Sequence, residues 1–177
     1  MPNAIEMLCA DHRNMKKLFE EFDRAGEARI KKQIIETTIR ELKMHGILEE
    51  EIFYTAVEKH IDDRELIDIA REEHQLFQLL MTGLKKVSGG GKRYNAKYKV
   101  LSDNVKNHIE AEESELFPKI EGRIDAEELG ARMEIRKTEL FQRNPRKRAA
   151  VGRSRRAGKA VQKGSAKSRK QRLAGRR

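Results

Sequence analysis

Apolar residues recur at alternating spacings of three and four along four stretches of the chain, the repeat of one face of an α-helix. These stretches cover residues 3–23, 28–59, 64–86 and 94–117. Turn-forming residues separate them at 25–26, 61–63 and 88–91, and Pro118 is expected to end or bend the last one. Because short connections make successive helices antiparallel, the pattern predicts an all-α fold, an up-down-up-down four-helix bundle.

Each apolar face is interrupted near its middle by polar residues that should point into the bundle. Every stretch contributes a histidine there and two add a glutamate one turn later, which gives His12, His45 with Glu49, His74, and His108 with Glu112. Residues i and i+4 lie on the same face of a helix, so each glutamate should follow its histidine inward. The second face is expected to continue through Ile52 and Ala56. At about 1.5 Å per residue, the six polar side chains fall at similar heights and could converge.

Such a cluster needs compensation if it is buried. Two unpaired buried carboxylates would cost several kcal/mol each, against the ~5–15 kcal/mol of net stability of a typical domain. One shared multivalent cation site, or two adjacent ones, would neutralise the carboxylates and use the imidazole nitrogens. The pattern therefore predicts a metal site formed by His12, His45, Glu49, His74, His108 and Glu112.

The donor types narrow the choice of metal. Six nitrogen and oxygen ligands without a thiolate do not suit a structural zinc site, which four ligands saturate. Imidazole with carboxylate suits iron, with manganese or zinc as competitors, and two glutamates on opposed helices could bridge two ions. A ferritin-like site would place Glu three residues before His. The residues at those positions are Cys9, Leu42, Arg71 and Val105, which disfavours that class.

The same residues resemble the hemerythrin family, in particular its HHE cation-binding domains. The resemblance covers about residues 1–120 and rests on His12 in ADHRNM, His45 and Glu49 in HGILEEEIFY, His74 in EEHQLF, and His108 and Glu112 in HIEAEESELFP. It implies a non-haem di-iron centre that binds or senses O2 and related small molecules. By this resemblance, His12 and His45 would serve one iron, His74 and His108 the other, and both glutamates would bridge.

One position departs from the oxygen carriers of that family. They have a histidine one turn before the third-helix ligand, where this chain has Ala70. Either one iron would lack a protein ligand there, or a nearby carboxylate such as Glu113 or Glu73 could replace the histidine. The departure argues against simple oxygen carriage and favours sensing of iron or redox state, NO or peroxide handling, or iron holding. An apolar pocket for the small ligand is expected to be walled by Phe19, Ile52, Phe77 and Leu116.

Charge is divided unevenly along the chain. Of 39 Lys and Arg, 15 lie in residues 143–177, which contain no acidic residue, and the other 24 share residues 1–142 with all 29 Asp and Glu. Residues 143–177 also have almost no large apolar side chains, so they are expected to be a disordered tail. That tail could bind a polyanion such as DNA or RNA, or serve only as a solvated extension. Before it, a bundle domain of residues 1–122 and a short helical extension of 123–142 are expected.

Other sequence features bear on compartment and activity. No apolar run is long enough to span a bilayer, and no secretory signal is recognisable. The single cysteine, Cys9, is expected to be a buried residue in a reducing compartment. These features predict a cytoplasmic protein without a membrane partner. A binding or sensing role is favoured, with a nucleic-acid-associated protein or a di-iron peroxidase or NO-handling enzyme as the alternatives.

Overall fold

The protein is all-α in the computed structural model, which describes residues 3–62, 64–87 and 91–142. The elements in chain order are α1 (Ala4–Arg24), α2 (Ala28–Leu48), η1 (Glu49–Phe53), α3 (Tyr54–Val57), α4 (Glu65–Lys86), α5 (Lys92–Ala111), η2 (Glu112–Leu116), α6 (Phe117–Ile120) and α7 (Ala126–Gln142). Both η elements are π-helical turns, so α2 continues through η1 into α3, and α5 continues through η2 into α6. The four long helices predicted from the apolar repeat are confirmed.

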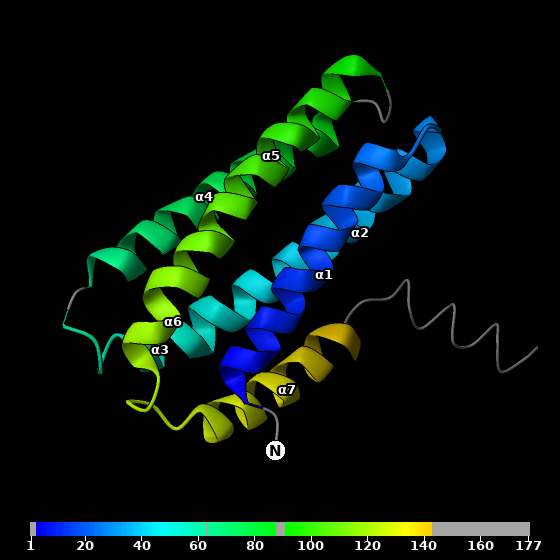
Figure 1. Cartoon of the computed structure of the whole chain (residues 1–177). Coiled ribbons are helices and arrows are strands. Elements are labelled where there is room, and N and C mark those ends of the chain that lie inside the picture. The colour runs from blue at the N-terminus through cyan, green and yellow to red at the C-terminus, as the bar shows by residue number, and fades with distance from the viewer. Residues whose placement is uncertain (1–2, 63, 88–90, 143–177) are drawn as a thin grey trace, which may run out of the picture. The chain divides into compact units, whose positions relative to one another are not determined.

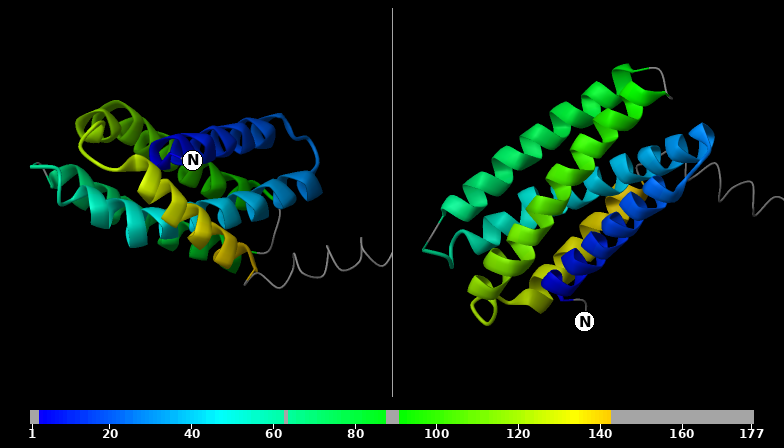
Figure 2. Two further views of the ribbon diagram at one scale, coloured as in Figure 1. Left: turned by 90° about the horizontal axis from the view of Figure 1, so that it is seen from below. Right: turned by 45° about the horizontal axis from the view of Figure 1, so that its top comes forward.

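Two helical hairpins form the bundle. The first pairs α1 with α2 and the second pairs α4 with α5, and α1 also contacts α5 (Figures 1 and 2). Local sequence sets the helix starts: the Asn3 side chain accepts hydrogen bonds from the backbone N–H groups of Ile5 and Glu6, at 3.0 and 3.3 Å. Asp125 caps α7 through a 2.8 Å bond from the N–H of Glu128.

Apolar packing fills the half of the bundle away from α3 and α6. Its fully buried members include Met15, Ile35, Tyr98, Leu101 and Val105. Thr38 is buried among them, and its hydroxyl lies 2.7 Å from the Tyr98 hydroxyl while it also donates to the Ile34 carbonyl. This packing holds four helices in one register and so fixes the heights of the polar residues near their middles.

The two π turns shift which residues face the core. A π turn inserts one extra residue, and this rotates the following residues by about 100° around the helix. Phe53, Tyr54 and Val57 are therefore fully buried, whereas Ala56, expected on the buried face, is only half-buried. Pro118 does not end the helix at its own position: it lies in α6, which directly follows the π turn η2 and runs on to Ile120.

The C-terminal region was expected to contain a short helix, and α7 is that helix. Residues 1–137 form one compact unit and residues 138–177 belong to a second. Within the first unit, α7 buries Leu129 and Met133 and places Arg136 and Lys137 against acidic residues of the bundle. The expected disordered tail of residues 143–177 lies outside the described residues, and the domain boundary at residue 122 stays a prediction. No described helix combines the length and apolarity needed to cross a membrane.

Candidate metal centre

Six polar side chains meet inside the bundle near the π turns, and they are the six expected from the sequence. Five of them, His12, His45, Glu49, His108 and Glu112, are at most 2% exposed, and the sixth, His74, is 8% exposed. The two glutamates are the first residues of η1 and η2, one turn beyond His45 and His108. Both π turns thus begin at the centre, a location typical of such turns.

The histidines form two close pairs. The Nε2 atoms of His12 and His45 are 3.1 Å apart, and those of His74 and His108 are 3.3 Å apart. The candidate ligand atoms of His12, His45, Glu49 and Glu112 lie within 4.8 Å of one another, and so do those of Glu49, His74 and His108. The centre therefore consists of two adjacent groups of donors that share a carboxylate.

Each glutamate reaches both histidine pairs. Glu49 Oε1 lies 3.1 Å from His45 Nε2, and its Oε2 lies 3.3 Å from His74 Nε2. Glu112 Oε2 lies 3.2 Å from His12 Nε2 and 3.5 Å from His108 Nε2. Each carboxylate is therefore close to one histidine of each pair.

The outer ring nitrogens of three histidines contact carboxylates. His12 Nδ1 is 2.9 Å from Glu113 Oε1, His74 Nδ1 is 3.0 Å from Glu50 Oε1, and His108 Nδ1 is 2.7 Å from Glu73 Oε2. An ionised carboxylate only accepts hydrogen bonds, so each Nδ1 carries the proton and each Nε2 presents a lone pair inward. A carboxylate behind the ring is the usual support of a metal-binding histidine.

This arrangement leaves inward-facing acceptors without donors, which tests whether a cation fits. Across the described residues, both oxygens of Glu49 and Oε2 of Glu112 are buried and accept no hydrogen bond, although the histidine nitrogens lie close. The inward lone pairs of His74 and His108, whose Nε2 atoms are 3.3 Å apart, need a positive charge between them. The donor set of imidazole nitrogen and carboxylate oxygen suits iron, manganese or zinc. The residues fit a metal.

Protons take the role of the cation when no metal is bound. Burial opposes protonation of the His45 ring, but the charges of Glu49 and Glu112 raise its pKa to about 10. Burial likewise opposes ionisation of Glu49, yet His45 and His74 hold the pKa of its carboxyl well below the ordinary value. Metal binding would therefore release a proton from the His45 ring, as is general for histidine sites.

Comparison with known proteins agrees with this site. The family model for the hemerythrin HHE cation binding domain matches residues 3–120, which include all six residues. The chain belongs to this family. Metal binding within a helical bundle is thus a property both of the family and of the buried His and Glu groups.

Two further relatives bear on the fold and on the length of the chain. An HHE cation-binding domain-containing protein from Mycobacterium kansasii has a crystal structure that matches with a TM-score of 0.67 at 23% identity. The match covers 79% of this chain and 88% of that one, and it shows the same fold. A DNA nickase from Nostoc sp. is 23% identical over 126 residues, which are 71% of this chain and 36% of that protein. The chain therefore spans about a third of the length of this curated relative.

Ala70, the departure from the oxygen-carrying hemerythrins, is buried and offers no ligand. The suggested replacements do not face the inner site: Glu113 contacts the outer nitrogen of His12, and Glu73 contacts that of His108. Both carboxylates orient histidines that other helices contribute. The half of the centre formed by His74 and His108 therefore has fewer protein donors than the half formed by His12 and His45.

Among the aromatic residues around the centre, the sequence predicted Phe77 but not Phe117 or Tyr54. Phe77 contacts the rings of His74 and His108, with centroids 5.9 and 5.4 Å away, as a wall residue should. Phe117 stacks on His12 at 5.9 Å, and the hydroxyl of Tyr54 donates a 2.7 Å hydrogen bond to Glu112 Oε1. Burial and the charges of Glu49 and Glu112 raise the pKa of Tyr54 well above its ordinary value, so it keeps this proton. The π turns bring Tyr54 and Phe117 inward, and the regular repeat gave no signal for either.

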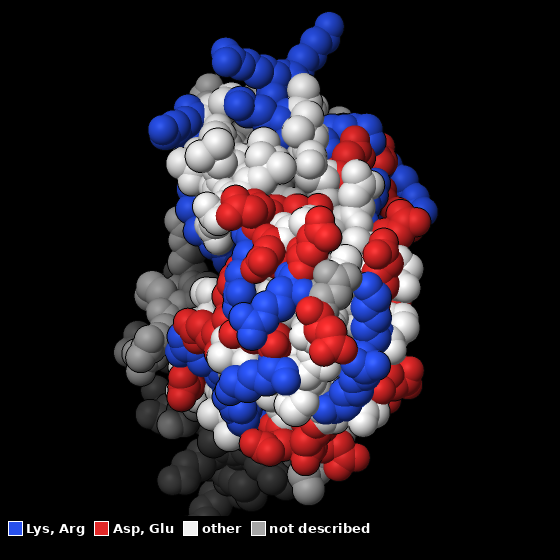
Figure 3. Space-filling model, turned by 90° about the vertical axis from the view of Figure 1, so that its left-hand side faces the viewer, with Lys and Arg blue, Asp and Glu red and all other residues white. Residues whose placement is uncertain are grey.

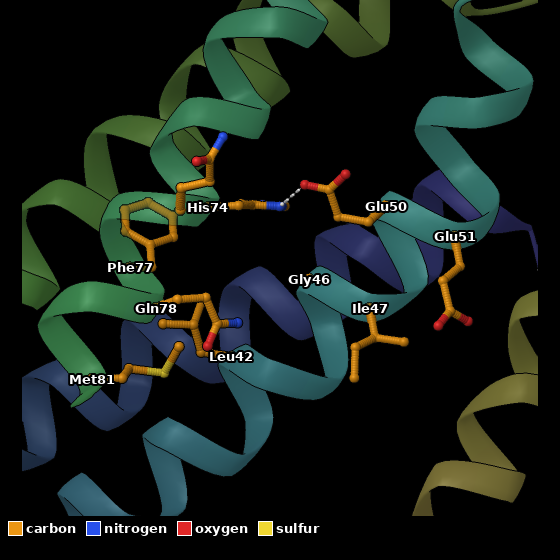
Figure 4. Close-up of a pocket in the computed structure, with 10 residues that line it drawn as sticks. Leu42, Gly46, Ile47, Glu50, Glu51, His74, Phe77, Gln78 and Met81 are labelled. Atoms are coloured by element: carbon orange, nitrogen blue, oxygen red, sulfur yellow. Dashed lines mark hydrogen bonds and ion pairs between the residues drawn. The ribbon is translucent and has the colours of Figure 1, made fainter. Parts of the chain in front are cut away.

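A surface pocket adjoins the centre at His74. It has a volume of about 260 Å³ and lies between α2 and α4, where Leu42, Phe77 and Met81 form apolar walls (Figure 4). His74 and Glu50, joined by their hydrogen bond, are two of its lining residues. A Cβ on Gly46 would stand 3.8 Å from His74 Cε1 and Nδ1, so the absence of a side chain there keeps the ring edge open.

The single cysteine, Cys9, was expected to be buried and is half-buried in the structure.

Proposed function

We propose that the protein holds a dinuclear non-haem iron centre and uses it to bind or sense O2 or a related small molecule such as NO or peroxide. The observation that carries this proposal is the double reach of Glu49, whose two oxygens lie within 3.3 Å of one histidine from each pair. One carboxylate with an oxygen for each of two donor groups suits two cations better than one. His12 and His45 would hold the first iron, His74 and His108 the second, and Glu49 and Glu112 both.

Bound iron would supply a redox-active cation that takes up a small ligand. The chain's own residues prepare the site for it. Glu113, Glu50 and Glu73 accept the Nδ1–H protons and so turn three Nε2 lone pairs inward. Phe77 and Phe117 exclude water from the histidine rings. Tyr54 holds Glu112 by one oxygen and leaves the other for the metals.

Metal analysis tests the proposal directly. Protein purified after iron supplementation should contain close to two iron atoms per chain and show a ligand-to-metal absorption band in air. His45→Ala and Glu112→Ala should lose both the iron and the band. His60→Ala removes an exposed histidine outside the centre and should keep them. An iron-supplemented chain that holds no metal would end the proposal.

Turnover separates a binding protein from an enzyme with the same centre. We expect the iron-loaded chain to bind its ligand in stoichiometric amounts. Sustained consumption of peroxide or NO, dependent on Glu49 and absent from the metal-free chain, would favour the peroxidase or NO-handling alternative. Loss of iron from Glu49→Gln without loss of turnover would show that the turnover belongs to a contaminant.

A second candidate function is association with nucleic acid. Residues 143–177 carry 15 Lys and Arg without an acid, and the similar Nostoc protein is a DNA nickase. The surface of the described residues is less suited to binding nucleic acid. Acidic and basic side chains are interspersed over most of the face drawn in Figure 3, and basic residues stand without acidic ones only at its upper end. We therefore assign polyanion binding to residues 143–177. Full-length chain should shift duplex DNA in a salt-dependent way, and a chain ending at Gln142 should not.

A further inference from the structure

Four acidic residues face the outer nitrogens of the four histidines, and together these pairs form a circuit around the bundle. Each follows or precedes a centre residue in the sequence, and each faces the histidine of another helix. Asp11 on α1 faces His45 on α2, Glu50 in η1 faces His74 on α4, Glu73 on α4 faces His108 on α5, and Glu113 in η2 faces His12 on α1. The circuit places one carboxylate behind every histidine.

Three links of the circuit are closed and one is open. The closed links are 2.7 to 3.0 Å long. The open link is the one between Asp11 Oδ2 and His45 Nδ1, at 3.8 Å, which is too long for a hydrogen bond. His45 Nδ1 is the single histidine nitrogen among the described residues that is buried without a partner.

The basic side chains that contact these acids explain why the Asp11–His45 link is open while the others are closed. Lys16 Nζ contacts Glu113 Oε2 at 2.9 Å and Arg71 Nε lies 3.5 Å from Glu50 Oε2, and in both cases Oε1 stays free for the histidine. Lys137 instead contacts both oxygens of Asp11, at 2.6 and 2.8 Å. Asp11 is thus held by both oxygens toward α7 and away from His45.

We propose that Lys137 is a positioning residue of the metal centre, which withholds Asp11 from His45 and so weakens one metal-binding histidine. Lys137 lies on α7, beyond residues 3–120 that match the family, and Arg136 beside it fastens α7 to Glu51 through bonds of 2.7 and 3.0 Å. The C-terminal helix therefore sets the strength of a site to which it gives no ligand. This inference rests on the proposed role of His45 as a metal ligand.

A shift of about 1 Å would bring Asp11 within hydrogen-bond distance of His45 Nδ1. The carboxylate would then hold the ring in place and make Nε2 a stronger donor, as outer carboxylates do at other histidine sites. Removing the cation should therefore tighten metal binding. If the Lys137–Asp11 ion pair only stabilised the fold, its removal would have the opposite effect: the site would loosen and metal affinity would fall.

The test is a set of Lys137→Met, Asp11→Asn and double-variant chains, titrated with Zn2+ and, without oxygen, with Fe2+ against a chromophoric chelator. Lys137→Met should bind the metal about 10-fold more tightly at one site, near the lower end of the effect of outer partners. The double variant should show no gain, because the amide cannot replace the carboxylate. Lys16→Met is the matched control and should change affinity less than 2-fold, since the Glu113–His12 link is already closed.

A second measurement keeps this inference separate from the proposed function. In metal-free protein, the Nδ1–H of His45 should become protected from exchange in Lys137→Met, as followed by 15N-resolved NMR of the histidine rings. Unchanged or weaker metal binding by Lys137→Met, with wild type loaded normally, would overturn the inference alone. Wild type that binds no iron would overturn the proposed function, while the NMR result would still decide whether Lys137 withholds Asp11.

Discussion

Replacing Glu49 with glutamine should damage the centre more than the same change at Glu112. Glu49 uses one oxygen toward His45 and the other toward His74, so an amide must present an NH2 group to one half of the site. Glu112 uses Oε2 toward the histidines and Oε1 to accept from Tyr54. A glutamine there can turn its NH2 toward the Tyr54 hydroxyl, which can rotate and accept, and keep its oxygen on the metal side.

The size of the effect follows from metal linkage. Loss of an outer partner costs 10–100-fold in metal affinity, so loss of a direct carboxylate oxygen should cost ~100-fold or more. At saturating metal, a 100-fold weaker site removes ~2.7 kcal/mol of metal-linked stabilisation. For a domain of this size, that lowers the Tm of the loaded protein by roughly 5–11 °C. Glu112→Gln should lose less than half as much.

Thermal unfolding with and without a chelator, beside metal content, measures this difference. The quantity to compare is the gap in Tm between loaded and metal-free protein, because it removes any effect of the substitution on the empty bundle. Glu49→Gln should close most of the gap and Glu112→Gln should keep most of it. Equal losses in the two variants, or an unchanged gap in Glu49→Gln, would refute the assignment of Glu49 as the carboxylate that both halves share.

Substitutions at three further positions probe the surroundings of the site. Gly46→Ala should keep the metal, since its Cβ would stand in ordinary contact 3.8 Å from His74, whereas Gly46→Leu should fill the pocket and lower metal content, as measured by elemental analysis. Tyr54→Phe removes the donor to Glu112 and should weaken metal binding about 10-fold in a chelator competition, without changing the helical content. Thr38→Val breaks the buried contact with Tyr98, so the free energy of unfolding in urea should fall by ~1–2 kcal/mol, with full metal content retained.

Much of the centre could be predicted because helix geometry is local. The three-and-four repeat placed four histidines and two glutamates on inner faces, and all six are buried together. The outer acids could not be found in that way, because Glu50, Glu73 and Glu113 lie off the apolar face and look like surface residues. The one feature of the sequence that could have identified them is that each directly precedes or follows one of the six residues of the centre. Which histidine each supports depends on helix packing, which the repeat alone does not specify.

The π turns explain the remaining differences between sequence and structure, and they connect the fold to the site. In a regular helix, the residues after Glu49 and Glu112 would keep the original face inward and bury Ala56. The extra residue in each turn instead brings Tyr54 onto Glu112 and Phe117 onto His12. It also leaves Glu50 and Glu113 beside the glutamates at the rim of the bundle, where they reach histidines on neighbouring helices. One local irregularity, repeated on two opposed helices, thus supplies both the aromatic walls and two of the four outer carboxylates.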